Sequence, residues 1–233
     1  MAVYNFSKMT RLRLGVIEDF DADVTPALMV QLAGALKGCQ FRLETESSYS
    51  LADAMESRSL DVIVAADLDI TSKWMEVHTL LTEPFIAVAP KGYVDRSKPV
   101  FEQVEKLPFV RYSSRQMMGR QIEAHLARQR INLPNRFEFG SYHAILSMVA
   151  GGGGWTVTTP LGYMRAQRFH GSLDVMPLQF KALSRSISLI ARKGEMESIA
   201  GDVAGLMRPL IREMLVNPCV AQYPWMEGAF RVE

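Results

Sequence analysis

One β-α-β unit in the second half of the chain does most to limit the folds that this sequence can adopt. The segment FEFGSYHAILSMVAGGGGWTVTTP begins as a strand, turns at Ser141, and continues as a short apolar helix with Ile145, Met148 and Val149 at helical spacing. The glycine run 151–154 ends this helix, and a β-rich run follows. Because parallel strands need such a crossover connection, the unit predicts a parallel sheet.

Hydroxyl groups lie where the strands of this unit end. Ser141 and Tyr142 follow the first strand, and Thr158 and Thr159 close the second. Ligands of open α/β sheets bind beyond the carboxyl ends of the strands. We therefore expect Ser141, Tyr142 and Thr158 to lie at a ligand-binding edge.

The order β-α-β-α-β occurs in both halves of the chain, which predicts a duplicated α/β architecture of two lobes with a cleft between them. Strands are expected at 12–17, 41–45 and 61–66 in the first half, and at 109–112, 136–139 and 155–159 in the second, with a helix at 116–129. A further strand, 85–89, precedes a change of composition at Pro90, Gly92 and Pro99.

Helix starts are expected where hydroxyl side chains precede apolar runs. Thr25 followed by Pro26 predicts a helix start after an acidic loop at 18–23. Ser48 or Ser50 is expected to cap the next helix.

The last part of the chain is expected to return to the first lobe. Alternation in RSISLIAR predicts a strand at 185–192, and residues 196–215 form an amphipathic pattern that is too long for a crossover of the second lobe. The resulting assignment is a linker remnant or added start at 1–10, lobe I at 11–89 and 182–233, and lobe II at 90–181. The tail 216–233 carries no pattern that assigns it a function.

The composition is that of an ordinary soluble globular protein. The chain has 48% hydrophobic and 22% charged residues, and its apolar runs fall short of the roughly 20 residues that span a bilayer. The start lacks the apolar core of a secretory signal, so we expect a cytoplasmic protein without a membrane partner. The cysteines, Cys39 and Cys219, are far apart and show no metal-binding spacing, so we expect no disulfide, metal or cofactor.

The net charge of +1 argues against nucleic-acid binding by the whole chain. Residues 1–89 hold 7 basic against 13 acidic side chains, whereas residues 90–180 hold 12 against 6. The basic residues are scattered, which favours attraction between oppositely charged lobes or subunits over contact with phosphate groups.

Catalysis has little support in the sequence. It contains no GxSxG elbow, HExxH pair, P-loop or helix-opening GxGxxG, and its histidines are isolated. An enzyme on this fold would need a perturbed ionisable group, and the acidic candidates at strand ends are Glu18, Asp19 and Asp67. We expect a binding protein rather than an enzyme.

Helix N-termini provide the candidate binding groups, because their unpaired N–H groups and partial positive charge suit carboxylates and phosphates. The serines expected at such termini are Ser47, Ser48, Ser50, Ser113, Ser114 and Ser141. Each of them is equally well explained as a simple N-cap. Their shared position at the ends of strands favours a ligand site.

The charge of the ligand stays open in the sequence. The loop with Glu18, Asp19 and Phe20 would repel an anionic ligand and attract a cationic or hydroxyl-rich one. Arg115 could instead bind a carboxylate from the second lobe.

The chain resembles the effector-binding domain of LysR-type transcriptional regulators over roughly residues 11–215. The pieces that carry the resemblance are the Ser, apolar helix, small-residue turn and Pro-ending strand of the first unit described above, together with LRLGVIEDF from Leu12, SYSLADAMESRSLDVIV from Ser48 and YSSRQMMGRQIEAHL from Tyr112. The resemblance implies two Rossmann-like lobes with a hinge and an interlobe cleft, like type 2 periplasmic binding proteins. Ser48 matches the family's Ser or Thr before the second helix, and Ser113, Ser114 and Ser141 match residues of its second lobe.

The resemblance also implies a function. A small-molecule effector of unknown identity would bind between the lobes and shift the packing of a homodimer or homotetramer. DNA would be bound only through an N-terminal winged helix-turn-helix that is missing from this sequence. The alternative on the same architecture is a solute-binding protein of a transporter, against which the absence of a secretion signal weighs.

Overall fold

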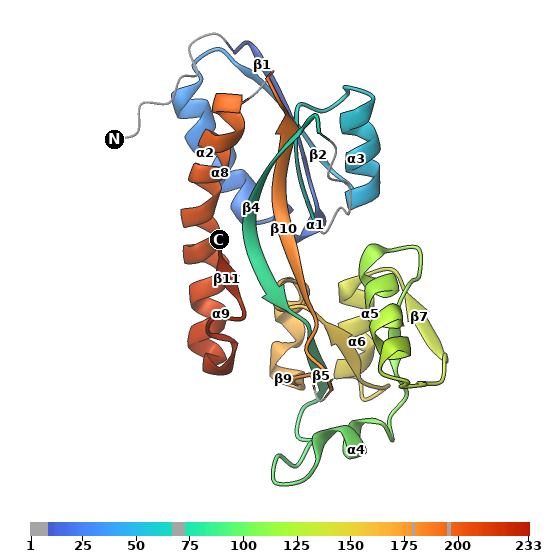
Figure 1. Ribbon diagram of the computed structural model, residues 1–233. Helices are drawn as coiled ribbons and strands as arrows, with labels where there is room; N and C mark the ends of the chain where they lie inside the picture. The colour runs from blue at the N-terminus through green and yellow to red at the C-terminus, as the bar shows by residue number, and fades with distance from the viewer. Residues whose placement is uncertain (1–8, 67–72, 179, 195–196) are drawn as a thin grey trace. The chain divides into compact units, whose positions relative to one another are not determined.

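The computed structural model describes residues 9–66, 73–178, 180–194 and 197–233 (Figure 1). The chain forms two compact units: unit 1 comprises residues 1–83 and 185–233, and unit 2 comprises residues 84–184. The chain therefore passes to unit 2 after Glu83 and returns at Arg185, a few residues from the boundaries placed on the sequence.

Among the described residues, the sheet of unit 1 has six strands in the order β11-β4-β10-β3-β1-β2. Its strands are β1 (Arg11–Val16), β2 (Gln40–Thr45), β3 (Val62–Ala66), β4 (Met75–Pro84), β10 (Ser184–Arg192) and β11 (Arg231–Val232). β1 runs parallel to β2 and β3, and β10 runs antiparallel to β3. Every residue of β3 is buried, as its uninterrupted apolar sequence VIVAA requires of a strand covered on both faces.

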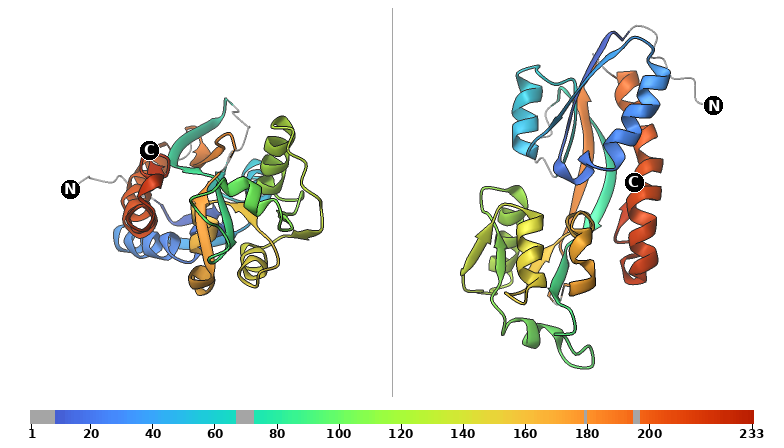
Figure 2. Two further views of the ribbon diagram at one scale, coloured as in Figure 1. Left: turned by 90° about the horizontal axis from the view of Figure 1, so that it is seen from below. Right: turned by 180° about the vertical axis from the view of Figure 1, so that it is seen from behind.

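Helices cover both faces of this sheet. Unit 1 contains α1 (Glu18–Asp21), α2 (Val24–Ala35), α3 (Ser48–Glu56), α8 (Glu197–Ile211), a π-helical stretch (Arg212–Val216), α9 (Asn217–Gln222) and a 3-10 turn (Pro224–Met226). α2 and α8 pack against one another on one face, and α3 lies on the other (Figures 1 and 2). The core between these layers includes Leu14, Val16, Ile63 and Leu189.

The sheet of unit 2 repeats the arrangement of unit 1. Its strands are β5 (Ile86–Pro90), β6 (Val110–Tyr112), β7 (Phe137–Phe139), β8 (Thr156–Thr158) and β9 (Leu173–Pro177). A parallel bridge between Phe109 and Trp155 joins the pair β6-β7 to the triplet β8-β5-β9, giving the order β7-β6-β8-β5-β9. As in unit 1, three parallel strands are followed by an antiparallel one, here β5 against β8. The predicted duplication is confirmed.

The helices of unit 2 are α4 (Val100–Val104), α5 (Met117–Arg128), α6 (Tyr142–Ala150), α7 (Pro160–Met164) and a 3-10 helix (Gln167–Ser172). The crossover β7-α6-β8 forms as expected, and α6 ends at Gly151. However, β6 lies between β7 and β8, so the crossover spans one intervening strand.

Three local expectations in unit 1 are wrong. Residues 18–21 form α1 instead of a loop. α2 starts at Val24 after Asp23, so Thr25 lies inside the helix and is buried. Ser47, and not Ser48 or Ser50, caps α3 by accepting a hydrogen bond from the backbone N–H of Ser50 at 3.2 Å.

Several elements were not expected from the sequence, namely β4, α4, α7, β9 and the structured tail. β4 shows no clean alternation of buried and exposed residues. By contrast, α7 has a readable signal, because Thr159 caps it and Pro160 occupies its first turn.

The tail after the π-helical stretch folds onto unit 1. Met226 and Phe230 are fully buried, and β11 pairs antiparallel with β4. Arg208 holds the end of the tail by donating to the backbone oxygens of Glu233 and Thr79. In the described ranges, no helix combines the length and apolar character needed to cross a membrane.

Candidate functional site

The carboxyl ends of the parallel strands of unit 1 lead into the predicted binding residues. α1 follows β1 directly, α3 follows β2 after Ser47, and Asp67 comes after β3. Asp67 lies outside the described residues.

The serines at the start of α3 have different roles. Ser48 is buried, and its hydroxyl accepts a hydrogen bond of 3.1 Å from the backbone N–H of Ala66, which ties α3 to the end of β3. Ser47 and Ser50 are exposed, and their hydroxyls lie 2.9 Å apart. The hydroxyl groups open to a ligand at this helix start are therefore those of Ser47 and Ser50.

The side chains of the acidic segment after β1 differ in their exposure to solvent. Glu18 is exposed, whereas Phe20 belongs to the core and Asp19 is buried. Successive residues of a helix point about 100° apart, so one turn cannot direct all three side chains to the same site. Because the sequence pattern predicts a loop here, it makes all three residues candidate ligand contacts.

Asp19 belongs to a buried ion cluster that was not expected from the sequence. The Arg185 guanidinium lies 2.9 Å from the Asp19 carboxylate and 2.6 Å from that of Glu83. The side chains of Asp19, Glu83 and Arg185 are each at least nine-tenths buried. The sequence places Arg185 at the start of a strand, but it gives no sign of these partners.

In unit 2, the turn between β6 and α5 carries Ser113, Ser114 and Arg115. The Ser113 hydroxyl accepts from the Arg115 N–H at 3.3 Å, and Arg120 donates to the Ser114 carbonyl at 2.9 Å. Ser114 and Arg115 are exposed and Ser113 is half-buried. These bonds fix the backbone of the turn and leave the Arg115 side chain toward solvent.

The turn that contains Ser141 lies beside the turn of Ser113. The Ser113 N–H donates to the Phe139 carbonyl at 2.8 Å, and the Gln116 side chain donates to the Gly140 carbonyl at 2.6 Å. The structure thus brings Ser113 and Ser141 to one edge of the sheet, as their positions after neighbouring parallel strands predict.

Ser141 is the N-cap residue of α6, but in the described structure its side chain makes no capping hydrogen bond. The residue is exposed, and the first bond of the helix runs from the Ile145 N–H to the Ser141 carbonyl at 3.1 Å. The N–H groups of the first turn therefore have no acceptor within the helix, and they carry the positive end of its dipole.

Tyr142 and Thr158 belong to one aromatic cluster. The Tyr112 hydroxyl lies 2.7 Å from that of Thr158, and the rings of Tyr112 and Tyr142 meet edge to face with centroids 5.7 Å apart. A Cβ atom at Gly162 would lie 2.6 Å from the Tyr142 ring, so the glycine is needed for the ring to approach. Thr158 is fully buried and supports the cluster, while Tyr142 is half-buried at its border.

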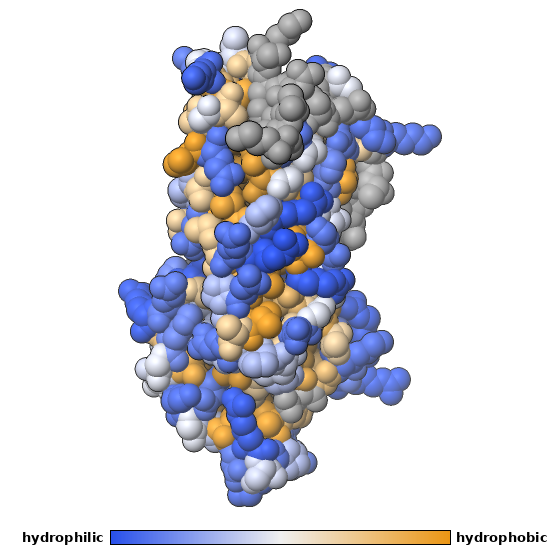
Figure 3. Space-filling view, turned by 90° about the vertical axis from the view of Figure 1, so that its left-hand side faces the viewer, coloured by the Kyte–Doolittle hydropathy of each residue, from blue (hydrophilic) through white to orange (hydrophobic). Residues whose placement is uncertain are grey.

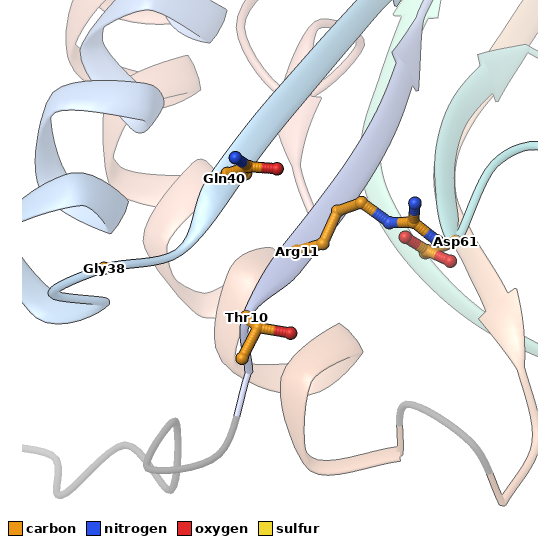
Figure 4. A pocket seen from close by; sticks show the side chains of 5 residues that line it. All are labelled: Thr10, Arg11, Gly38, Gln40 and Asp61. Atoms are coloured by element: carbon orange, nitrogen blue, oxygen red, sulfur yellow. The ribbon is translucent and has the colours of Figure 1, made fainter.

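The described cavities lie away from these residues. A pocket of about 620 Å³ in unit 1 is lined by Thr10, Arg11, Gly38, Gln40 and Asp61. It lies at the amino ends of β1 and β2, where the side chains of Arg11 and Asp61 approach one another (Figure 4). A groove of about 350 Å³ in unit 2 lies beside α5 and includes Arg111 and Glu123. Neither contains a residue predicted for the site.

Comparison with known proteins gives a family and a set of similar structures. The model of the LysR substrate binding domain matches residues 7–208. No curated protein matches the chain.

The similar solved structures include the reduced form of OxyR from N. meningitidis, with 18% identity and a TM-score of 0.71 over 96% of this chain and 99% of that one. An H2O2-bound cysteine mutant of OxyR from Corynebacterium glutamicum has 16% identity and a TM-score of 0.74 over 93% of this chain and 68% of that one. The effector binding domain of QuiR in complex with shikimate has 13% identity and a TM-score of 0.67 over 90% of this chain and 99% of that one. These likenesses show the fold, which is α/β and like that of type 2 periplasmic binding proteins.

Proposed function

We propose that this chain, which belongs to the LysR substrate binding domain family, holds its effector with hydroxyl groups and helix N-termini at the carboxyl ends of its parallel strands. Membership makes it the effector-sensing regulatory domain of a LysR-type transcription regulator, a family that controls transcription and is not enzymatic. The observation that carries the proposed site is the start of α6, where the exposed Ser141 leaves its helix uncapped beside Tyr142.

In unit 2, we assign ligand contact to Ser113, Ser114, Arg115, Ser141 and Tyr142. Their support is a common edge of the sheet, the positive end of the α6 dipole and the exposed Arg115 guanidinium. Thr158 is assigned a supporting role, because it is buried and its hydroxyl is bonded to Tyr112.

In unit 1, we assign ligand contact to Glu18, Ser47 and Ser50. The exposure of these residues at the starts of α1 and α3 supports this choice. Ser48 and Phe20 are buried, so we assign them to the framework of the site.

These groups favour a hydroxylated carboxylic acid as the effector. In unit 2, the start of α6 and Arg115 suit a carboxylate. In unit 1, Glu18 disfavours an anionic group and can accept hydrogen bonds from hydroxyls. The half-buried Tyr142 ring offers an apolar face to a carbon skeleton. The shikimate bound by the QuiR domain is a molecule of this class.

Peroxide sensing through a cysteine has less support, although OxyR structures are among the similar ones. Burial, followed by the charge of Glu83, raises the pKa of the Cys219 thiol to about 12. Burial also raises the pKa of Cys39. Because the thiolate is the reactive form, both cysteines should react slowly with H2O2 near neutral pH.

We further propose that the domain self-associates through α2. This helix contains no charged residue, yet Val30 on its outward side is 75% exposed. A helix that is apolar on all sides is normally covered. α2 lies on the side of the molecule that Figure 3 displays, where hydrophobic side chains emerge between hydrophilic ones. A second copy of the chain would cover this face and form a homodimer.

Titration calorimetry against a panel of small molecules tests the effector class. The panel should contain shikimate and other hydroxylated carboxylic acids, the corresponding amines, neutral sugars and amino acids. We expect saturable binding among the hydroxylated acids and weaker binding of the uncharged analogues. Binding confined to amines or sugars would overturn the proposed class, and mass spectrometry of molecules carried through purification would identify the ligand independently.

A further inference from the structure

We propose that Arg185 is a positioning residue that joins α1, at the ligand edge of unit 1, to the strands β4 and β10 through which the chain leaves and re-enters this unit. The inference rests on the proposed function, because it concerns the helix that carries Glu18. Its geometric basis lies wholly within unit 1.

Two nitrogen atoms of the Arg185 guanidinium contact its two acidic partners. Its Nε donates to Glu83 Oε1 at 2.7 Å, and a terminal nitrogen donates to Asp19 Oδ1 at 2.9 Å. The same terminal nitrogen lies 2.6 Å from Glu83. The planar guanidinium can hold both carboxylates in fixed directions, which a lysine ammonium cannot do.

The topology places this cluster at the ligand edge. β10 runs antiparallel to β3, so its amino end, with Arg185, lies beside the carboxyl ends of the parallel strands. The Glu83–Arg185 and Thr82–Ser186 side-chain contacts show that β4 ends at the same edge. Since α1 begins directly after β1, Asp19 meets the cluster at the point where the chain changes units.

The Asp19–Arg185 contact helps to hold α1 in position. The helix has four residues, and its N-cap is Ile17, whose side chain offers no hydrogen-bond acceptor. A single helical turn has little stability of its own. It is held by the burial of Phe20 and by the Asp19–Arg185 pair. Moving α1 would take the Asp19 carboxylate away from Arg185 and break one arm of this buried cluster, which is unfavourable.

A ligand that contacts Glu18 therefore acts on a helix whose next residue, Asp19, is paired with Arg185 of β10 and, through it, with Glu83 of β4. Any displacement of α1 must be shared by Arg185 and Glu83 or must break the cluster. Ligand binding at Glu18 would thus affect the ends of β4 and β10, where the chain passes between the units.

Amide hydrogen exchange of the ligand-free protein tests the inference, so its result does not depend on any effector. The isosteric variants Asp19→Asn and Glu83→Gln each weaken one arm of the cluster. Asp61→Asn is the control, because Asp61 forms an ion pair with Arg13 in the same unit, away from the cluster, with Oδ1 at 2.5 Å from the guanidinium and both side chains 20% exposed.

We expect Asp19→Asn to increase exchange at residues 17–23 at least tenfold while residues 82–87 and 184–187 keep their protection. Glu83→Gln should produce the opposite pattern. Arg185→Lys should loosen both segments, and Asp61→Asn should leave both unchanged. The proposal would be overturned if Asp19→Asn left α1 unaffected, or if both cluster variants raised exchange uniformly across β1 and β3, which would indicate a general loss of stability. The effector class is judged separately by calorimetry on the unmodified protein.

Discussion

The serine residues of the proposed site differ in what their hydroxyl groups do, and this difference decides which substitutions are informative. Ser48 links α3 to β3 and is buried, so its replacement would disturb the framework. Ser141 is exposed and does not cap its helix in the described structure. Substitution of Ser141 therefore separates ligand contact from folding.

We predict that Ser141→Ala and Ser113→Ala weaken effector binding without unfolding the domain. The loss of one hydrogen bond of about 1 kcal/mol corresponds to a roughly fivefold to tenfold weaker affinity. Calorimetry with an effector from the acid panel measures it. Ser147→Ala is the control, since Ser147 is exposed on the same helix α6 but lies farther along it. Unchanged affinity in both site variants would count against the site.

The buried Cys219 thiol should make stability depend on pH in alkaline solution. Its pKa is raised from 9.0 to about 12, chiefly by burial and further by Glu83. Above about pH 9 the unfolded chain releases this proton while the folded chain keeps it, so the free energy of unfolding falls as the pH rises toward 12. Urea unfolding from pH 8 to 11 should show the Cys219→Ala variant losing less stability than the unmodified protein. A constant difference between the two would contradict the prediction.

At the scale of elements, the tail shows how a segment without a recognisable pattern becomes part of the fold. β11 has two residues, yet it lies along the edge of β4, and Phe230 immediately before it is buried. An uncovered edge strand invites pairing with other chains. The tail therefore protects this edge and completes the core of unit 1.

We predict that Phe230→Ala destabilises the domain by about 3–5 kcal/mol, the usual cost of truncating a buried aromatic residue. Trp225→Ala, at a tail position that is 38% exposed, should cost much less. Denaturant unfolding of the two variants gives the comparison. Equal costs would mean that the tail does not dock as described.

In the proposed dimer, a second copy of the chain covers the exposed apolar side of α2. We predict that Val30→Glu shifts the protein toward monomer, because it places a charge on the face that a second copy would cover. Val77→Glu is the control, since Val77 is also exposed but lies on β4. Analytical ultracentrifugation over a range of concentrations measures both. A dimer that persists in the Val30→Glu variant would exclude α2 as its interface.

The family was indicated by the resemblance of whole segments and is shown by the family match. From its local patterns, the sequence predicts the repeated β-α-β-α-β order and the edge of each sheet at which its serines lie. These features depend on local periodicity, on helix stop residues such as Gly151 and on the rule that parallel strands end at one edge. They can be predicted because each depends on residues that are only a few positions apart in the sequence.

Only the tertiary structure decided which side chains of a motif are exposed and which are buried in the core. Asp19 meets Arg185 across 166 positions of the chain, and Thr82 meets Glu233 across 151. Such contacts follow from the order of strands in the sheet, which brings distant segments together. The local sequence pattern does not predict these contacts, because a buried ion pair or a paired edge strand is stabilised only when its partner from a distant part of the chain is in place.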